Sequence, residues 1–252
     1  MIRVSVAAAV SVVLLSVVNS APVFGFEYSG DEGPANWHEL DAGFANCGLG
    51  INQSPIDIQR PIMRDIGLGA LQLDLHDTEV HLENNGHTIE QVYEAGSTLT
   101  FGGVTYELLQ FHFHTLAEHT IGGKRHPMEM HAVFRDAGTG NLAVIGQLFK
   151  IDRHGLSNAF LDAFDDNLPP KAHDEFESAT HINLADGLKN TRSYFTYPGS
   201  LTTPPCSPIV TWLVLHHVAT MSQAQYDAFR DIMGNNFRPT QERGARTIRR
   251  GD

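Results

Sequence analysis

Alternation of apolar and polar residues is the main pattern along this chain, and it predicts short β-strands. Leu71, Leu73 and Leu75 are separated by polar residues, as in a strand with one buried face. Longer apolar runs, which predict buried strands, cover residues 130–135, 142–149 and 209–218. Residues 136–141, rich in Gly, Asp and Asn, separate the first two runs and predict a turn.

Two segments have apolar residues at helical spacing, and these are Leu156, Phe160 and Phe164 in the first and Tyr226, Phe229 and Met233 in the second. The first predicts a helix over 156–168. The second follows Ser222 and Gln225, which together form a capping-box signature for a helix start. No repeat or linker divides the chain, and 252 residues suffice for one large domain. We therefore expect a mainly β (α+β) single domain with small peripheral helices.

Residues 109–114 read Leu-Gln-Phe-His-Phe-His and carry the first candidate chemistry. Side chains alternate between the faces of a strand, so Gln110, His112 and His114 share one face. The three apolar residues of the run share the other face. One His-x-His pair is weak evidence for a metal, because the chain has 14 histidines and chance alone produces such pairs.

A second strand candidate, residues 128–133, places Glu129, His131 and Val133 on one face. The glycine pair 122–123 allows the intervening segment to turn back, so that the two strands lie together. Three imidazoles without a fourth protein ligand are typical of a catalytic Zn²⁺ site, in which water takes the open position.

Gln110 and Glu129 each lie two residues before a predicted ligand, on the same face. A metal-bound histidine usually donates its other ring N–H to such an oxygen, which fixes its tautomer. The matching phase of these five residues favours a zinc site over a chance pattern.

The N-terminal segment, residues 1–25, is typical of a secretory signal peptide. Arg3 supplies a positive charge, and Val4 to Val18 is apolar. Cleavage could follow Ser20, Ala21 or Gly25, and the mature domain would then cover about residues 26–252. A transmembrane anchor is the alternative, but the apolar run is short for a bilayer. We expect a periplasmic or secreted protein that leaves the membrane after cleavage.

Loss of residues 1–25 removes Arg3 and no acid, which takes the formal charge from −12 to −13. So acidic a surface disfavours nucleic acid and anionic membranes as partners. Cys47 and Cys206 are the two cysteines, and in an exported protein such a distant pair favours one disulfide. Two buried free thiols are the alternative.

Several blocks of the sequence, in order, resemble the α-class carbonic anhydrases, particularly the exported bacterial branch. They include 33–38 around Trp37, 53–58, 84–87, the two histidine runs, 118–120, 142–146, 197–206 and 210–212. The resemblance covers nearly the whole mature chain. It implies a central twisted, largely antiparallel sheet of about ten strands and the reversible hydration of carbon dioxide to bicarbonate and a proton.

The resemblance also implies catalytic roles. Thr202 matches the threonine that orients the zinc-bound hydroxide, and Glu118 matches the glutamate that accepts the threonine proton. His87 matches the histidine that shuttles protons to solvent, a role that suits a group with a pKa near neutrality. Taken without the resemblance, these would be a turn threonine, a loop acid and a surface histidine.

Further residues match the walls of the family's cleft. The substrate-binding wall corresponds to Val133, Val144, Leu201, Thr203, Val210 and Trp212. The ordered waters of the family lie near positions that correspond to Tyr28, Asn85 and Glu90, the last a departure from the asparagine common in well-known members. Bacterial members are often dimers, so a homodimer is one expectation, although no segment of the sequence marks an interface.

Two other functions compete with this interpretation. A catalytically silent binding module with the same fold would normally lack a zinc histidine or a neighbour, whereas the whole set is present here. A different zinc hydrolase would be expected to carry His-Glu-x-x-His on a helix, and the sequence has no such motif.

Overall fold

The computed structural model describes residues 25–49, 51–164 and 167–251. The predicted signal peptide, apart from Gly25, lies outside these residues. Within the described part of the chain, no helix combines the length and apolar composition that crossing a bilayer requires.

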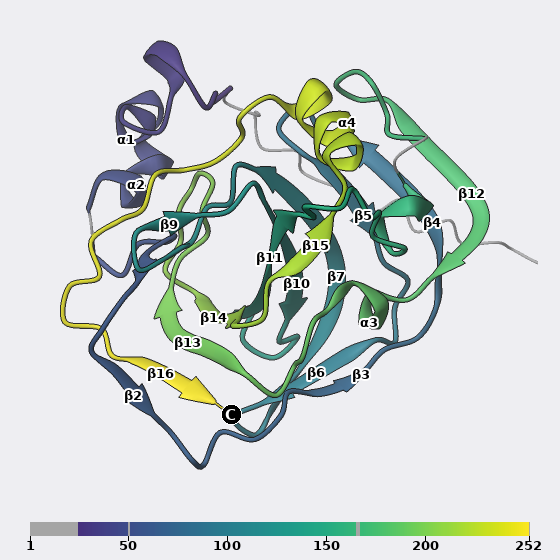
Figure 1. The fold of residues 1–252 in the computed structure, drawn as a ribbon. Coiled ribbons are helices and arrows are strands. Elements are labelled where there is room, and N and C mark those ends of the chain that lie inside the picture. The colour runs from purple at the N-terminus through teal and green to yellow at the C-terminus, as the bar shows by residue number, and fades with distance from the viewer. Residues whose placement is uncertain (1–24, 50, 165–166, 252) are drawn as a thin grey trace, which may run out of the picture.

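Thirteen strands form one large, strongly twisted sheet that runs through the middle of the molecule (Figure 1). Its main path is β12 (Glu175–Ile182), β4 (Thr78–Asn84), β5 (Ile89–Val92), β7 (Val104–Thr115), β10 (Met128–Arg135), β11 (Leu142–Ile151), β14 (Val210–Leu215), β13 (Tyr194–Gly199), β16 (Ile248–Gly251) and β2 (Ile62–Arg64). Beside it, β15 (Ala219–Met221) pairs with β11, and β3 (Gln72–Asp74) pairs with β6 (Thr98–Phe101), which pairs with β7.

Most neighbours in this sheet are antiparallel, but β11–β14, β11–β15 and β16–β2 are parallel pairs. The expected mainly β fold with a largely antiparallel sheet is therefore confirmed. A small second sheet joins β1 (Asp57–Ile58), β8 (Thr120–Ile121) and β9 (Lys124–Arg125). Gly122 and Gly123 form the β8–β9 turn with φ of +59° and +77°, a conformation that favours glycine.

The helices are short and peripheral, as expected. They are η1 (Gly30–Glu32), α1 (Trp37–Leu40), η2 (Ala42–Phe44), α2 (Asn46–Leu49), η3 (Leu161–Ala163), α3 (Leu184–Gly187) and α4 (Gln223–Met233). The capping box that predicts α4 is present, because Ser222 accepts from the backbone N–H of Gln225 and the Gln225 side chain accepts in return from that of Ser222.

The predicted helix over 156–168 is wrong, since among its described residues only η3 is helical. Asn158 instead uses its side-chain oxygen to bond the Phe160 N–H, which favours a single turn. Phe160 and Phe164 are both buried with ring centroids 5.2 Å apart, whereas Leu156 is exposed. A single helical turn is enough to bring the two buried rings together, so their spacing does not require the longer helix that was predicted.

The sheet separates an apolar core from a face that carries polar chemistry. On β7, Phe111 and Phe113 are fully buried in the core, and on β10 Met130 and Ala132 join them. The alternate residues of both strands point the other way, as the sequence predicts. The register of β7 and β10 is thus fixed by apolar residues on the face opposite the histidines.

Cys47 and Cys206 form a disulfide, as predicted. It joins α2 to the loop after β13, and carbonyl oxygens of both cysteines accept hydrogen bonds from buried side chains, Arg238 and Gln53. The disulfide is consistent with export to an oxidising compartment.

We expect the double variant Cys47→Ser/Cys206→Ser to lower the free energy of unfolding by roughly 2–5 kcal/mol, because it removes a cross-link between residues 159 positions apart. Urea unfolding of the variant and of reduced wild-type protein would measure the loss, and the two should agree. Two titratable thiols in the native, oxidised protein would contradict the prediction.

Candidate metal centre

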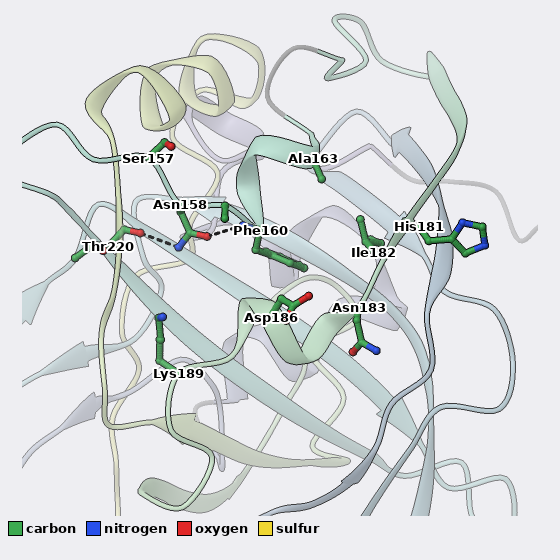
Figure 2. Close-up of a pocket in the computed structure, with 11 residues that line it drawn as sticks. Ser157, Asn158, Phe160, Ala163, His181, Ile182, Asn183, Asp186, Lys189 and Thr220 are labelled. Atoms are coloured by element: carbon green, nitrogen blue, oxygen red, sulfur yellow. Dashed lines mark hydrogen bonds between the residues drawn. The ribbon is translucent and has the colours of Figure 1, made fainter.

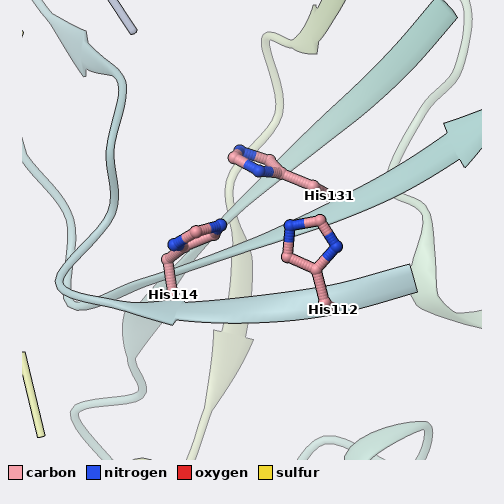
Figure 3. Close-up of side chains that lie close together, drawn as sticks. All are labelled: His112, His114 and His131. Atoms are coloured by element: carbon pink, nitrogen blue, oxygen red, sulfur yellow. The ribbon is translucent and has the colours of Figure 1, made fainter. Parts of the chain in front are cut away.

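Three histidines from adjacent strands converge on the polar face of the sheet (Figure 3). In the antiparallel pairing of β7 with β10, His131 lies directly opposite His112, and Glu129 lies opposite His114. One nitrogen from each ring lies within 4.8 Å of the others. His114 and His131 are each only 1% exposed, so these two rings are almost fully shielded from bulk water.

The other nitrogen of each ring faces a protein oxygen. His112 Nδ1 bonds Gln110 Oε1 at 2.9 Å, His114 Nδ1 bonds the Asn236 carbonyl at 2.7 Å, and His131 Nε2 lies 3.0 Å from Glu129 Oε1. These oxygens accept, so those nitrogens carry the protons. The lone pairs therefore lie on His112 Nε2, His114 Nε2 and His131 Nδ1, which face the centre. His114 Nε2 is buried and has no hydrogen-bond partner among the described residues, as expected of an atom placed to bind a metal.

The rings are held in the neutral form that binds metals. Burial lowers the pKa of His114 to about 4. Burial, with the neighbouring His114 and His131, lowers the pKa of His112 well below its ordinary value. At neutral pH all three rings offer lone pairs, since burial also lowers the pKa of His131. Three neutral nitrogens fit Zn²⁺ or a similar transition metal and leave a coordination position open.

Glu129 accepts several hydrogen bonds behind the triad. Oε2 accepts from the backbone N–H groups of Glu118 and His119 at 2.9 and 2.8 Å, and Oε1 accepts from His119 Nδ1 at 2.8 Å and lies 3.0 Å from His131 Nε2. Burial acts to raise the pKa of Glu129, but His119 and His131 hold it well below its ordinary value.

His119, Glu129 and His131 also satisfy the geometric criterion for a metal cluster. Their facing atoms already bond one another, however, and His119 Nε2 lies 2.6 Å from Tyr197 Oη. His119 thus belongs to a hydrogen-bonded chain behind the site, which agrees with a structural role for it.

Comparison with known proteins identifies the family. Residues 32–251 match the sequence model of the eukaryotic-type carbonic anhydrases. A carbonic anhydrase of Nostoc sp. is 36% identical over 232 residues, covering 90% of this chain and 86% of its own. A carbonic anhydrase from a hydrothermal vent chimney superposes with a TM-score of 0.84 at 40% identity, covering 90% of this chain and 100% of its own. An α-carbonic anhydrase from Thermovibrio ammonificans, solved with the inhibitor sulfanilamide, gives 0.84 at 35% identity over 89% of this chain and 98% of its own.

The chain belongs to the α-carbonic anhydrase family. It is a carbonic anhydrase, an enzyme for the reversible hydration of carbon dioxide, and its buried histidine triad matches the metal site of that family.

Glu118 lies beside the triad of this carbonic anhydrase and is fully buried. Its Oε1 accepts from the backbone N–H of Arg238 at 2.8 Å, and its Oε2 lies 3.7 Å from His114 Nε2. Burial raises the pKa of Glu118, although His131, the Arg238 N–H and the Thr202 side chain act to lower it. Thr202 is also buried, and its side chain is one of the groups that act on the Glu118 carboxyl.

A cleft of about 220 Å³ opens over the triad and contains several of the expected residues. It is lined by His112 and His114 of the triad together with Phe26, Tyr28, Asn85, His87, Thr88, Glu90, Gln110 and Thr203. The residues of the expected apolar wall do not line this cleft. Val144, Val210 and Trp212 are buried in a separate cluster, against which Val133 and Leu201 pack. The Trp212 ring centroid is 4.8 Å from that of His131.

The cleft residues have partners that the sequence did not predict. The His87 ring stacks on Phe26 at a centroid distance of 4.0 Å, and its Nε2 donates to the Phe26 carbonyl at 2.7 Å. Glu90 accepts from Gln110 Nε2 at 3.1 Å, and burial together with Glu83 raises its pKa to about 7. Asn85 uses its side-chain oxygen within the 85–88 turn.

A larger cavity of about 430 Å³ lies away from the triad, between η3, α3 and the end of β12 (Figure 2). Asn158 and Asn183 on its wall already bond protein groups, and His181 points away from it. The smaller cleft, unlike this cavity, contains two histidines of the triad.

Two supports of the site come from distant residues. The Asn236 carbonyl that fixes His114 lies 122 residues away in sequence, and a backbone carbonyl leaves no side-chain signal to predict it. Gly146 lies opposite His131, and a Cβ at this position would lie 2.8 Å from Glu129 Oε1. Only glycine lets β11 pass this close to the carboxylate.

We expect Gly146→Ala to lower metal affinity by roughly ten-fold or more, because the new methyl group would displace the carboxylate that orients His131. Competition with a chromophoric chelator would measure it. Gly69→Ala is the control, since a Cβ there meets nothing within 4 Å. Unchanged affinity in the Gly146 variant would contradict this account of the packing.

Proposed function

We propose that the chain hydrates carbon dioxide with one Zn²⁺ held by His112, His114 and His131. The observation that supports this most directly is the convergence of three neutral, pre-oriented imidazoles with an unpartnered buried nitrogen. Zinc would supply a Lewis acid, which in carbonic anhydrases lowers the pKa of a bound water to about 7. Gln110 and Glu129 fix the tautomers of two ligands.

Thr202 and Glu118 would orient the nucleophile. An ionised carboxylate only accepts hydrogen bonds, so a threonine hydroxyl beside it donates its proton to Glu118. The hydroxyl oxygen of Thr202 then accepts from the nucleophile and aims it at the substrate. The Arg238 N–H and the buried position hold Glu118 in place for this role.

The substrate is apolar, and a dry wall beside the triad would bind it. We assign this wall to Val133, Val144, Leu201, Val210 and Trp212, which pack as one apolar cluster. Thr203 lines the adjoining polar cleft. The Trp212 ring centroid lies 4.8 Å from that of His131, which brings this wall up to the triad.

His87 would carry protons between the cleft and solvent. Since its Nε2 donates to the Phe26 carbonyl, the neutral ring has its lone pair on Nδ1 and can accept a proton there. The ring is half-buried, in contact with both the cleft and the surface. Tyr28, Asn85 and Glu90 line the same cleft and would hold the waters of the relay.

We further propose export of the mature domain, residues 26–252, to the periplasm or the exterior after cleavage of residues 1–25. The disulfide and the signal-peptide pattern support this. Carbon dioxide and bicarbonate are the small-molecule partners. A homodimer stays a prediction, because the structure describes a single chain.

We expect His112→Ala to abolish zinc retention and carbon dioxide hydration together, because one of three ligands is lost. Metal analysis with stopped-flow hydration would measure both. His76→Ala, which changes an exposed histidine, is the control and should match wild type. Normal hydration by a zinc-free variant would remove the metal proposal, whereas a zinc-loaded wild type without hydration would favour a silent binding module.

We expect His87→Ala to slow turnover by roughly ten- to a hundred-fold in weakly buffered solution, because the proton relay is lost. Added imidazole should restore the rate, since it accepts the proton in place of the side chain. His181→Ala, an exposed histidine outside the cleft, should show neither effect. If imidazole has no influence on a slow His87 variant, the shuttle assignment is wrong.

A further inference from the structure

The three ligand histidines differ in how their outer nitrogens are anchored. His114 Nδ1 donates to a backbone carbonyl and His131 Nε2 lies 3.0 Å from a carboxylate oxygen, and both oxygens can only accept a hydrogen bond. His112 bonds the side-chain amide of Gln110, which has an accepting oxygen at one position and a donating NH₂ at the other. Of the three anchors, only this one could turn round.

The orientation of that amide decides whether His112 can bind a metal. With Gln110 Oε1 facing Nδ1, His112 carries its proton on Nδ1 and its lone pair on Nε2, toward the centre. With the amide reversed, its NH₂ would require the lone pair on Nδ1. The proton would then occupy Nε2 and block one of the three metal donors.

Glu90 bonds the other end of the same amide. It lies directly opposite His112 in the pairing of β5 with β7, and its Oε2 accepts from Gln110 Nε2 at 3.1 Å. Gln110 Oε1 in turn accepts from His112 Nδ1 at 2.9 Å. A reversed amide would bring its oxygen against an oxygen of the ionised Glu90 carboxylate, and two acceptors that face each other without a donor are unfavourable.

We propose that Glu90 is a positioning residue: by holding the Gln110 amide in one orientation, it selects the metal-binding tautomer of His112 before the metal arrives. This inference rests on the proposed zinc site at His112, His114 and His131. It concerns the metal-free protein, because a bound metal would itself keep the proton on His112 Nδ1.

Zinc affinity and the His112 tautomer in the metal-free protein test this proposal. Glu90→Ala should lower the affinity for Zn²⁺ by about three- to ten-fold, less than loss of a direct outer partner of a ligand. Long-range ¹H–¹⁵N spectra should show His112 protonated on Nδ1 in wild type and on either nitrogen in the variant. Glu90→Gln, which can both accept and donate, should lie between them.

A rescue variant separates positioning from general damage. In Glu90→Ala/Gln110→Glu the carboxylate at 110 offers only acceptors to His112, so zinc affinity and the Nδ1 tautomer should return without Glu90. Glu83→Gln controls for charge, because Glu83 lies opposite Glu90 but does not bond Gln110, and it should leave zinc affinity unchanged.

Three outcomes would overturn the proposal: unchanged affinity and tautomer in Glu90→Ala, an equal loss in Glu83→Gln, or no recovery in the double variant. Each would leave the zinc site itself intact. Wild-type protein that fails to bind Zn²⁺ would instead contradict the proposed function, so the two failures are distinguishable.

Discussion

The pairing register of β7 with β10 is the constraint on which the site depends. It places His131 opposite His112, and a slip of one residue would turn all the ligands of one strand to the other face of the sheet. Phe111, Phe113 and Met130 oppose such a slip, because it would move buried apolar side chains out of the core. β10 is also paired on its other side with β11, so the ligand strand has no free edge along which to shift. The metal centre is therefore held by apolar packing on the opposite face.

The second level of support comes from chain segments far apart in sequence. Asn236 fixes a ligand with its carbonyl, and its side chain also donates to the carbonyl oxygens of His87 and Phe113. Two residues later, the Arg238 backbone N–H holds Glu118, while its buried guanidinium donates to the Cys47 and Ser54 carbonyls. The segment after α4 thus connects the disulfide, the cleft and the triad. These supports exist only in the folded chain, which explains why a local pattern does not reveal them.

The sequence predicted those features that depend on alternation within a strand. The ligands, Gln110 and Glu129 share a face because strand geometry dictates it, and no tertiary information is needed. The sequence could not predict the Asn236 carbonyl or the stacking of Phe26 on His87, since a carbonyl is common to every residue and an aromatic near a terminus usually packs in a core. The prediction of a helix over 156–168 was wrong for a related reason. Apolar spacing shows which side chains are buried together, but it does not show that the Asn158 side chain bonds the Phe160 N–H and so favours a single turn.

The order of strands also divides the two halves of the proposed reaction. On one side of β7 lies β5, which carries Glu90 and follows the His87 turn, so the polar cleft forms there. On the far side of β10 lie β11 and β14, which supply the apolar cluster around Trp212. His112 therefore faces the wet side, and His131 lies beside the dry side. Substrate bound at the triad would therefore lie against the apolar side, and protons would leave through the polar cleft on the other side, so water needed for proton transfer would not compete for the substrate wall. The Gln110 amide, the one outer partner of the triad that has two possible orientations, also lies on the polar side. Glu90 lies there too and bonds this amide.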